Sequence, residues 1–259
     1  MTICKRRIFG CFLFFTLIIA VFFIFLQSKY TVPIMMYHNV NYSKQLTGYN
    51  ANPQNFEKHM QFLKQHGYKV ISLEQLVNII KEKRPLPRKS VVITFDDGYQ
   101  DNYDRAFPIL KKYGYPAAIF VIVDVVGEFG HFSWEQMKEM EGHGITIGSH
   151  TLDHVYLPGV SENMQNHQIT ESKRILEAKL GHPVDFFCYP SGGFSDSIKL
   201  MVQKAGYRAS CTTNRGYVPL NRDVYELKRI RFNDRDYPLS LWIKLSGFYN
   251  AFKAPRDPY

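Results

Sequence analysis

Two histidines and a pair of adjacent aspartates are the side chains of this sequence best suited to hydrolytic chemistry. His150 and His154 lie four positions apart, a spacing that on one helical turn points both imidazoles in the same direction, as a metal-binding pair requires. Asp96 and Asp97 form a separate cluster that can deliver a carboxylate to the same cation. Two histidines and one aspartate leave an open coordination position, which is typical of a hydrolytic rather than a structural metal site.

The adjacent carboxylates of Asp96 and Asp97 indicate two different roles. Along a continuing strand they point in opposite directions, so one can bind the metal while the other approaches a water bound to it. Two carboxylates in one pocket repel each other, and a cation makes the ionisation of both tolerable. The alternative interpretation is that Asp96, Asp97 and Gly98 only form a turn that ends a strand.

Three polar clusters each follow a short apolar run that is typical of a buried strand. The clusters are residues 96–98 after the run 91–95, residues 149–154 after the run 145–148, and residues 190–193 after the run 184–189. In a (β/α) barrel the carboxyl ends of all strands face one rim. We therefore expect clusters that are distant in sequence to converge on one pocket.

Strand-like runs alternate with helix-like segments from residue 30 onward. Further strands are expected at 33–37, 69–71, 117–123, 209–212 and 227–232. Helices are predicted from residue 53 to Gly67, after the capping boxes Ser72/Gln75 and Ser133/Gln136, from Ser161 to Gly181, and over 198–205. Because seven or eight strands alternate with helices over about 230 residues, we expect an α/β fold, an irregular (β/α) barrel of about seven strands.

The first thirty residues differ from the rest of the chain. Residues 8–26 contain no charged side chain, and the run is long enough to cross a bilayer as a helix. Lys5, Arg6 and Arg7 precede it, so the positive-inside rule predicts a short cytoplasmic terminus and an extracellular remainder. No small-residue cleavage signal follows the run. We therefore expect residues 1–30 to form a retained single-pass signal anchor in the cell membrane, and residues 31–259 to form one catalytic domain.

Composition narrows the class of protein. The 259 residues are 45% hydrophobic and 21% charged, which excludes collagen, a disordered tail and a disulfide-dense miniprotein. The net charge of +9 is spread along the chain rather than gathered in one stripe, so we expect no nucleic-acid partner. Cys188 and Cys211, the two cysteines beyond the apolar run, could form one disulfide or remain buried free thiols.

Two motifs together resemble the polysaccharide deacetylase, or NodB-homology, family of carbohydrate esterases. They are residues 94–98 (TFDDG) and residues 149–154 (SHTLDH). Residues 33–40, 52–76 and 227–231 are similar to the branch that contains the poly-N-acetylglucosamine deacetylases of biofilm systems. The resemblance implies metal-dependent hydrolysis of N-acetyl groups from an N-acetylglucosamine-containing polysaccharide of the cell envelope, either poly-N-acetylglucosamine or peptidoglycan. Zinc is the expected cation, with cobalt or nickel as alternatives.

The resemblance also assigns roles within the two motifs. Asp96 would be the general base. Asp97 would bind the metal together with His150 and His154.

A third motif of the wider family is only partly preserved. It supplies an arginine that orients the base and an aromatic residue whose backbone N–H helps to form the oxyanion hole. Cys188 and Ser191 stand at these positions here. The Ser191 N–H survives the change but the arginine does not, so Arg229 is the expected replacement, with Arg231 as the second candidate.

The general acid of the wider family is a histidine near the carboxyl end, and no histidine follows His182 in this chain. In the biofilm-type branch the equivalent motif is displaced to the start of the domain, where His38 lies. The alternative for His38 is a surface histidine just past the anchor. Two other functions also fit the sequence: a metal-dependent amidohydrolase with a non-carbohydrate substrate, and a membrane-tethered glycan-binding protein without catalysis.

Overall fold

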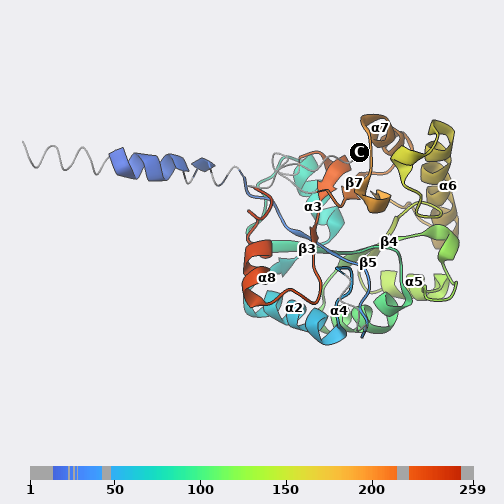
Figure 1. Cartoon of the computed structure of the whole chain (residues 1–259), viewed down its shortest axis with the longest axis horizontal. Helices are drawn as coiled ribbons and strands as arrows, with labels where there is room; N and C mark the ends of the chain where they lie inside the picture. Colours follow the sequence, from blue (N-terminus) through green and yellow to red (C-terminus); the bar gives the residue numbers. More distant parts are fainter. Residues whose placement is uncertain are drawn as a thin grey trace, which may run out of the picture.

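The computed structural model describes residues 14–22, 24–25, 27, 29–42, 48–214 and 222–251. Within these ranges, parallel strands form one sheet that curves into a near-barrel with helices on its outside (Figure 1). The strands are β1 (Ile34–Tyr37), β2 (Lys69–Val70), β3 (Ser90–Phe95), β4 (Ala117–Val121), β5 (Ile145–Ser149), β6 (Phe186–Cys188), β7 (Ala209–Thr212), β8 (Leu227–Lys228) and β9 (Ile230–Arg231). Each predicted strand is present, with small shifts at its ends.

The sheet closes through its last strand. Its order is β8-β7-β6-β5-β4-β3-β1-β9, with β2 paired to β3 outside this path. Only Arg229 separates β8 from β9 in the sequence, yet Leu227 pairs with Cys211 of β7 while Ile230 pairs with Met35 of β1. The segment predicted as one strand is therefore divided at Arg229 and joins both edges of the sheet. This division makes eight strands along the path where about seven were predicted.

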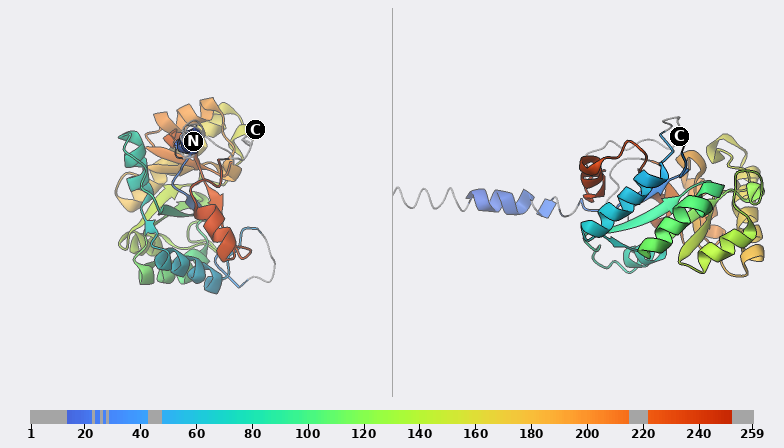
Figure 2. Two further views of the ribbon diagram at one scale, coloured as in Figure 1. Left: turned by 90° about the vertical axis from the view of Figure 1, so that its left-hand side faces the viewer. Right: turned by 90° about the horizontal axis from the view of Figure 1, so that it is seen from below.

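Seven α-helices of the described chain, α2 to α8, surround the sheet (Figures 1 and 2). They are α2 (Pro53–Gln65), α3 (Leu73–Lys81), α4 (Phe107–Tyr113), α5 (Trp134–Glu141), α6 (Glu162–Leu180), α7 (Asp196–Lys204) and α8 (Pro238–Leu245). The two predicted capping boxes form at the starts of α3 and α5, and α6 ends at Gly181 with a positive φ of 83°. The helices α4 and α8 were not predicted.

Alternate residues of the strands face two different surroundings. Ile93 and Ile119 belong to the buried cluster that packs against the outer helices, whereas Val92 and Phe120 belong to a second cluster. Successive side chains of a strand point to opposite faces. Asp96, four residues after Val92, therefore continues the inward-facing row beyond the end of β3.

The predicted membrane helix over 8–26 falls partly outside the described residues. The described residues from 14 to 27 are helical, and their large apolar side chains are exposed, Phe14 at 65%. No helix within the ranges given above is both long enough and apolar enough to span a bilayer. The predicted cytoplasmic stub, with Lys5 to Arg7, lies outside the described residues.

Candidate active site

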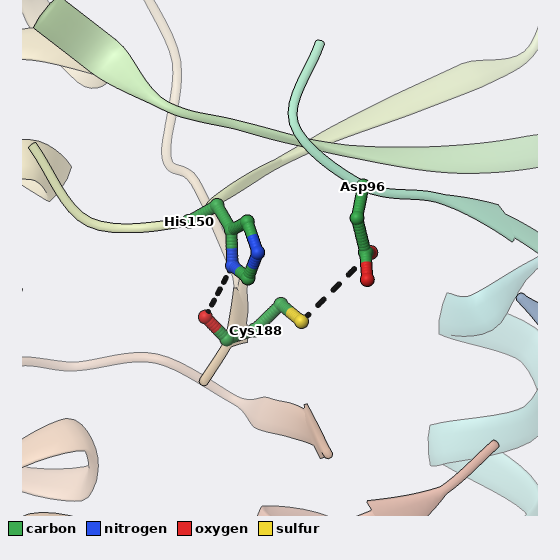
Figure 3. A group of neighbouring side chains, drawn as sticks. All are labelled: Asp96, His150 and Cys188. Carbon is green, nitrogen blue, oxygen red and sulfur yellow. Dashed lines mark hydrogen bonds between the residues drawn. The ribbon is translucent and has the colours of Figure 1, made fainter. Parts of the chain in front are cut away.

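The carboxyl ends of neighbouring strands bring the predicted polar clusters together. His38 follows β1, Asp96 and Asp97 follow β3, His150 follows β5 and Cys188 ends β6. The Nδ1 atom of His150 lies 2.8 Å from the carbonyl oxygen of Cys188, and the Sγ atom of Cys188 lies 3.9 Å from Oδ1 of Asp96 (Figure 3). Side chains that are about ninety residues apart along the chain thus meet at one rim, as the barrel topology predicts.

Asp96 is held by a buried arginine. Nη1 and Nη2 of Arg229 donate to Oδ1 and Oδ2 of Asp96 at 2.6 and 2.7 Å. Both residues are at most 2% exposed, and Nη1 also donates to Oγ1 of Thr94 at 3.2 Å. Burial alone would raise the pKa of the Asp96 carboxyl, but the charge and hydrogen bonds of Arg229 outweigh it and hold this pKa well below its usual range.

Of the two candidate arginines, Arg229 and not Arg231 contacts Asp96. The guanidinium carbon of Arg231 lies over the ring of Tyr49, 4.1 Å from its centre. Arg229 lies at the break between β8 and β9. From this position its side chain points into the barrel and reaches the carboxylate of Asp96. The sequence left Arg229 and Arg231 as alternative partners of Asp96. The pairing of β9 with β1 places Arg229 beside this carboxylate.

Asp97 lies close to both histidines of the second motif. Its Oδ1 atom lies 3.6 Å from Nε2 of His150 and 3.7 Å from Nε2 of His154. One ligand atom from each of the three residues lies within 4.8 Å of the others. Oδ1 of Asp97 is buried and has no hydrogen-bond partner among the described residues. An orphaned carboxylate oxygen between two imidazole nitrogens is what a divalent cation would satisfy, so these residues fit a metal.

The ring orientation of His150 suits metal binding. Its Nδ1 atom lies 2.8 Å from the backbone oxygen of Cys188, an arrangement in which Nδ1–H donates and Nε2 remains free for a cation. Burial lowers the pKa of His150 and so favours the neutral, ligating form. Burial is also the largest cause of the raised pKa of Asp97, which is what a carboxylate without a nearby cation shows.

The two histidines meet through a loop and not through a helical turn, which corrects the reason given for their spacing. Residues 150–154 are not helical. Thr151 and His154 have positive φ values of 68° and 65°, and Oγ1 of Thr151 accepts a hydrogen bond from the backbone N–H of His154 at 3.0 Å. The resulting bend brings the two rings to a centroid distance of 4.8 Å.

Backbone strain is concentrated at this rim. Six non-glycine residues of the described chain have positive φ, and four of them, Asp97, Thr151, His154 and Ser191, belong to the motifs of the site. Such conformations are unfavourable for side chains with a Cβ and persist only where the surrounding structure fixes them. The strain at Asp97 also ends the simple alternation expected from a continuing strand, because φ is 74° there.

A second group of possible metal ligands, Asp96, His150 and Cys188, is less suitable (Figure 3). The Arg229 guanidinium occupies this space, with Nη2 at 3.0 Å from Sγ of Cys188, so a cation would meet a fixed positive charge. Burial raises the pKa of the Cys188 thiol well above its usual value and keeps it protonated. Cys188 and Cys211 are neighbours in the sheet register and both are free thiols.

His38 lies beside the base. Its Nε2 atom is 3.8 Å from Oδ2 of Asp96, and its Nδ1 atom is buried without a hydrogen-bond partner in the described part of the chain. Burial is the largest cause that lowers the pKa of His38, to about 4, against the opposing charge of Asp96. His38 is therefore neutral at neutral pH. It is not the exposed surface histidine of the alternative interpretation, because its side chain is only 13% exposed.

Two residues that the sequence analysis missed hold the segment around His38. Asp101 accepts hydrogen bonds from the backbone N–H of Val40 at 2.9 Å and from Nδ2 of Asn41 at 2.8 Å. Asn102, which is 1% exposed, donates from Nδ2 to the carbonyl oxygen of His38 at 2.7 Å. The acid and the amide follow the first motif closely in sequence, but no periodicity indicates that they reach across to β1.

Ser191 lies in the turn after β6, with a positive φ of 54°. The N–H groups of Gly192 and Gly193 in this turn donate to the carbonyl oxygens of Tyr189 and Pro190, whereas the Ser191 N–H has no acceptor among the described residues. A Cβ on Gly192 would lie 2.1 Å from Oγ1 of Thr213, so the turn requires glycine at this position.

Comparison with known proteins agrees with this geometry. Residues 83–210 match the sequence profile of the polysaccharide deacetylase family. The Bacillus subtilis protein YxkH, which carries a polysaccharide deacetylase name, is 36% identical over 200 residues that cover 77% of this chain and 71% of the relative. The chain belongs to the polysaccharide deacetylase family.

Two further proteins, one compared by sequence and one by structure, are similar to this polysaccharide deacetylase. The poly-beta-1,6-N-acetyl-D-glucosamine N-deacetylase of Staphylococcus epidermidis is 31% identical over 202 residues, covering 73% of this chain and 70% of the relative. The structure of the Streptococcus pyogenes deacetylase PplD in complex with acetate superposes with a TM-score of 0.77 at 30% identity, covering 83% of this chain and 97% of that one. The (β/α) barrel expected from the sequence is thus the fold of a known deacetylase.

Proposed function

We propose that this polysaccharide deacetylase hydrolyses the N-acetyl groups of an N-acetylglucosamine polymer of the cell envelope and releases acetate. The observation that carries the proposal is the pairing of two carboxylates with different partners at one rim. Asp97 lies with an orphaned oxygen between His150 and His154, and Asp96 next to it is fixed by Arg229. The substrate class is supported by the name of the Staphylococcus epidermidis relative.

The set of Asp97, His150 and His154 favours zinc, with cobalt or nickel as alternatives, because two imidazoles and one carboxylate leave an open position for substrate. When bound, the cation would polarise the acetamide carbonyl and lower the pKa of the attacking water. The Ser191 N–H, which has no protein acceptor among the described residues, would stabilise the negative charge that develops on the carbonyl oxygen.

The remaining residues would move one proton from water to the leaving amine. Asp96, oriented by Arg229, takes the proton of the attacking water. Because its pKa is held low, the carboxyl group binds this proton weakly and passes it to Nε2 of His38, 3.8 Å from Oδ2 in the resting site. His38 then protonates the departing nitrogen, and the products are acetate and an amine. A neutral resting His38 suits this sequence, since it must receive the proton before it donates it.

We also propose that residues 8–26 anchor the enzyme in the cell membrane, with residues 31–259 outside. The run without charged residues and the exposed apolar side chains of its described part support this proposal. Extraction of the full chain from membranes by detergent but not by alkaline carbonate, with the catalytic domain open to protease on intact cells, is the expected result. Release by carbonate, or protection of the domain, would contradict it.

Acetate release tests the reaction. The full chain in detergent, loaded with zinc, is incubated with poly-N-acetylglucosamine, peptidoglycan and a chitin oligomer. We expect acetate from at least one of these polymers, loss of release with a chelator, and its return with zinc, cobalt or nickel. Acetate from small non-carbohydrate acetamides alone would indicate an amidohydrolase, and glycan binding without acetate would indicate a non-catalytic binding protein.

A further inference from the structure

The N-terminal helix joins the domain at the end of the barrel opposite the catalytic rim. Tyr30, just before β1, is 5% exposed, and its hydroxyl donates to the carbonyl oxygen of Pro87 at 3.0 Å. The guanidinium of Arg88 lies 3.9 Å from the centre of the Tyr30 ring. The backbone N–H of Thr31 donates to the carbonyl oxygen of Gly247 at 2.9 Å. The segments before β3 and after α8 therefore meet where the helix leaves the domain.

The segment before β3 is strongly basic. Residues 81–89 contain five lysines and arginines and one acid, Glu82. Lys83 and Arg84 are exposed, and together with Arg222 they surround a cavity of about 270 Å³ that has Ile80 and Leu86 in its wall. An apolar wall with a basic rim suits an anionic headgroup that carries hydrocarbon.

The helix α8 presents apolar side chains to solvent beside this basic segment. Leu241 and Leu245 face the core and are 3% exposed. Leu239, Trp242 and Ile243 form a stripe on another side of the helix and are 60%, 44% and 53% exposed. Figure 1 places α8 at the edge of the domain from which the N-terminal helix projects, and the left view of Figure 2, which looks at that edge, has α8 in front.

We infer that residues 81–89 and the exposed stripe of α8, together the docking face, rest on an anionic lipid bilayer. The inference builds on the proposed anchor, which enters the domain at this same face. A helix with an apolar stripe next to clustered lysine and arginine side chains is the composition of an interfacial membrane contact. A tryptophan in such a stripe suits the boundary between headgroups and acyl chains.

Docking would fix the orientation of the enzyme. Residues 81–89 precede β3 at the amino-terminal end of the barrel, and the last turn of α8 reaches the same end, where the hydroxyl of Tyr68, next to the start of β2, donates to the carbonyl oxygen of Leu245 at 3.3 Å. His38, Asp96 and His150, in contrast, lie at the carboxyl ends of the strands. The catalytic rim then points away from the bilayer. The substrate polymer therefore reaches the site from outside and does not have to pass between the domain and the lipid.

The two tryptophans of the chain provide the test, because Trp242 belongs to the docking face and Trp134 lies on α5 at the far end of the domain (Figure 1). The full chain is inserted into nanodiscs of phosphatidylglycerol with brominated acyl chains. In the Trp134→Phe variant, the emission of the remaining Trp242 should fall severalfold relative to unbrominated lipid. In the Trp242→Phe variant, the emission of Trp134 should not change.

Matched variants separate the contributions to docking, each made in the Trp134→Phe chain. Ile243→Asp should remove the quenching of Trp242, whereas Leu200→Asp, which changes an exposed leucine of α7, should not. Lys83→Gln and Arg84→Gln should each lower the docked fraction in anionic lipid roughly fivefold. Acetate release from a soluble N-acetylglucosamine oligomer should stay unchanged in all four variants.

The outcomes distinguish the docking face from the anchor. A chain that never enters the nanodisc contradicts the anchor and the docking that builds on it. An inserted chain whose Trp242 is not quenched contradicts the docking alone. A dimer in the same nanodisc, with Trp242 shielded from brominated lipid, would assign the stripe of α8 to a second copy of the chain and would also overturn the inference.

Discussion

The two carboxylates of the site lie next to each other in the sequence but differ in how their charge is balanced. Asp96 is 1% exposed and forms two short hydrogen bonds with the buried Arg229. Asp97 is also buried, but its Oδ1 faces the imidazoles of His150 and His154 and has no hydrogen-bond partner in the described chain. The protein thus supplies a permanent positive charge for the proposed base and leaves the charge of the ligand set to a bound cation.

This difference in charge balance explains why Asp96, the proposed base, and Asp97, the proposed metal ligand, would keep separate roles. A cation is repelled from Asp96 because Arg229 already occupies that space, and it is attracted to Asp97 because no lysine or arginine of the described chain pairs with that carboxylate. The residues therefore fit one metal ion beside Asp97, while the neighbouring carboxylate would remain free to take a proton. Variants that remove one of these charges at a time test whether the two carboxylates differ in this way.

Removal of the ligand carboxylate should have the largest effect on activity. In Asp97→Asn the cation loses its only charged ligand, so metal content and acetate release should fall to background. The free energy of unfolding of the metal-free protein should not decrease, because the substituted carboxylate had no partner for its Oδ1. Metal analysis and urea unfolding in chelator measure the two quantities. A large loss of metal-free stability would contradict the contrast with Asp96.

Removal of the arginine should affect stability as well as activity. Arg229→Ala leaves the Asp96 carboxylate buried without a counter-charge, which should lower the free energy of unfolding by about 3–5 kcal/mol. The double variant Asp96→Asn/Arg229→Ala should recover part of this loss, because the uncompensated charge is gone. Arg231→Ala, which removes an arginine that does not contact Asp96, is the matched control. Equal losses in the two single variants would contradict the role given to Arg229.

Replacement of His38 should slow catalysis without affecting the metal. His38→Gln keeps a polar side chain but cannot carry the proton to the amine, so kcat should fall roughly 10²–10⁴-fold. Zinc content should be unchanged, since His38 is not a ligand in the proposed set. Steady-state acetate release and metal analysis on the same preparation test both statements. An unchanged kcat would remove His38 from the proton path.

Loss of the Asp101 carboxylate should have a smaller effect. Asp101→Ala removes the acceptor of the Val40 N–H and loosens the segment that carries His38. We expect kcat to fall about tenfold through misplacement of the imidazole. Asp101→Asn, which keeps one acceptor oxygen, should restore part of the rate, whereas Asp104→Ala nearby should not change it. A change in metal content in Asp101→Ala would indicate a general disturbance of the rim.

The pH dependence of stability should show the environment of His38. Its folded-state pKa of about 4 lies below the ordinary value of 6.5, so the unfolded chain takes up the proton first as the pH falls. The wild-type protein should therefore lose stability from about pH 6.5 down to about pH 4, by an amount on the order of 1–3 kcal/mol from this group. His38→Gln should lack this component. Parallel slopes of unfolding free energy against pH in the two proteins would contradict it.

The strands and helices whose ends are marked by nearby residues could be predicted from the sequence. Strands with apolar runs and helices with capping boxes, such as Ser72 with Gln75, are defined by neighbouring residues, and their positions were predicted well. The meeting of the clusters around Asp96 and His150 followed from topology alone. The identity of the family came from the two motifs around Asp96 and His150.

What could not be predicted depends on register between distant segments. Nothing local distinguishes Arg229 from Arg231, and only the pairing of β8 with β7 and of β9 with β1 decides which one faces Asp96. The contacts of Asp101 and Asn102 with the segment after β1 likewise join residues about sixty positions apart. The helical spacing of the two histidines gave the right pair for the wrong reason, because a strained loop brings them together.

The break at Arg229 connects closure of the sheet with assembly of the proposed site. The residue that lies between the two edges of the sheet is also the residue that balances and orients Asp96. Arg229 follows all the other proposed site residues in the sequence, so it is the last of them to be synthesised. Until it arrives, the barrel is open and the base has no counter-ion. The proposed base therefore gains its counter-ion in the same step that pairs β8 with β7 and β9 with β1.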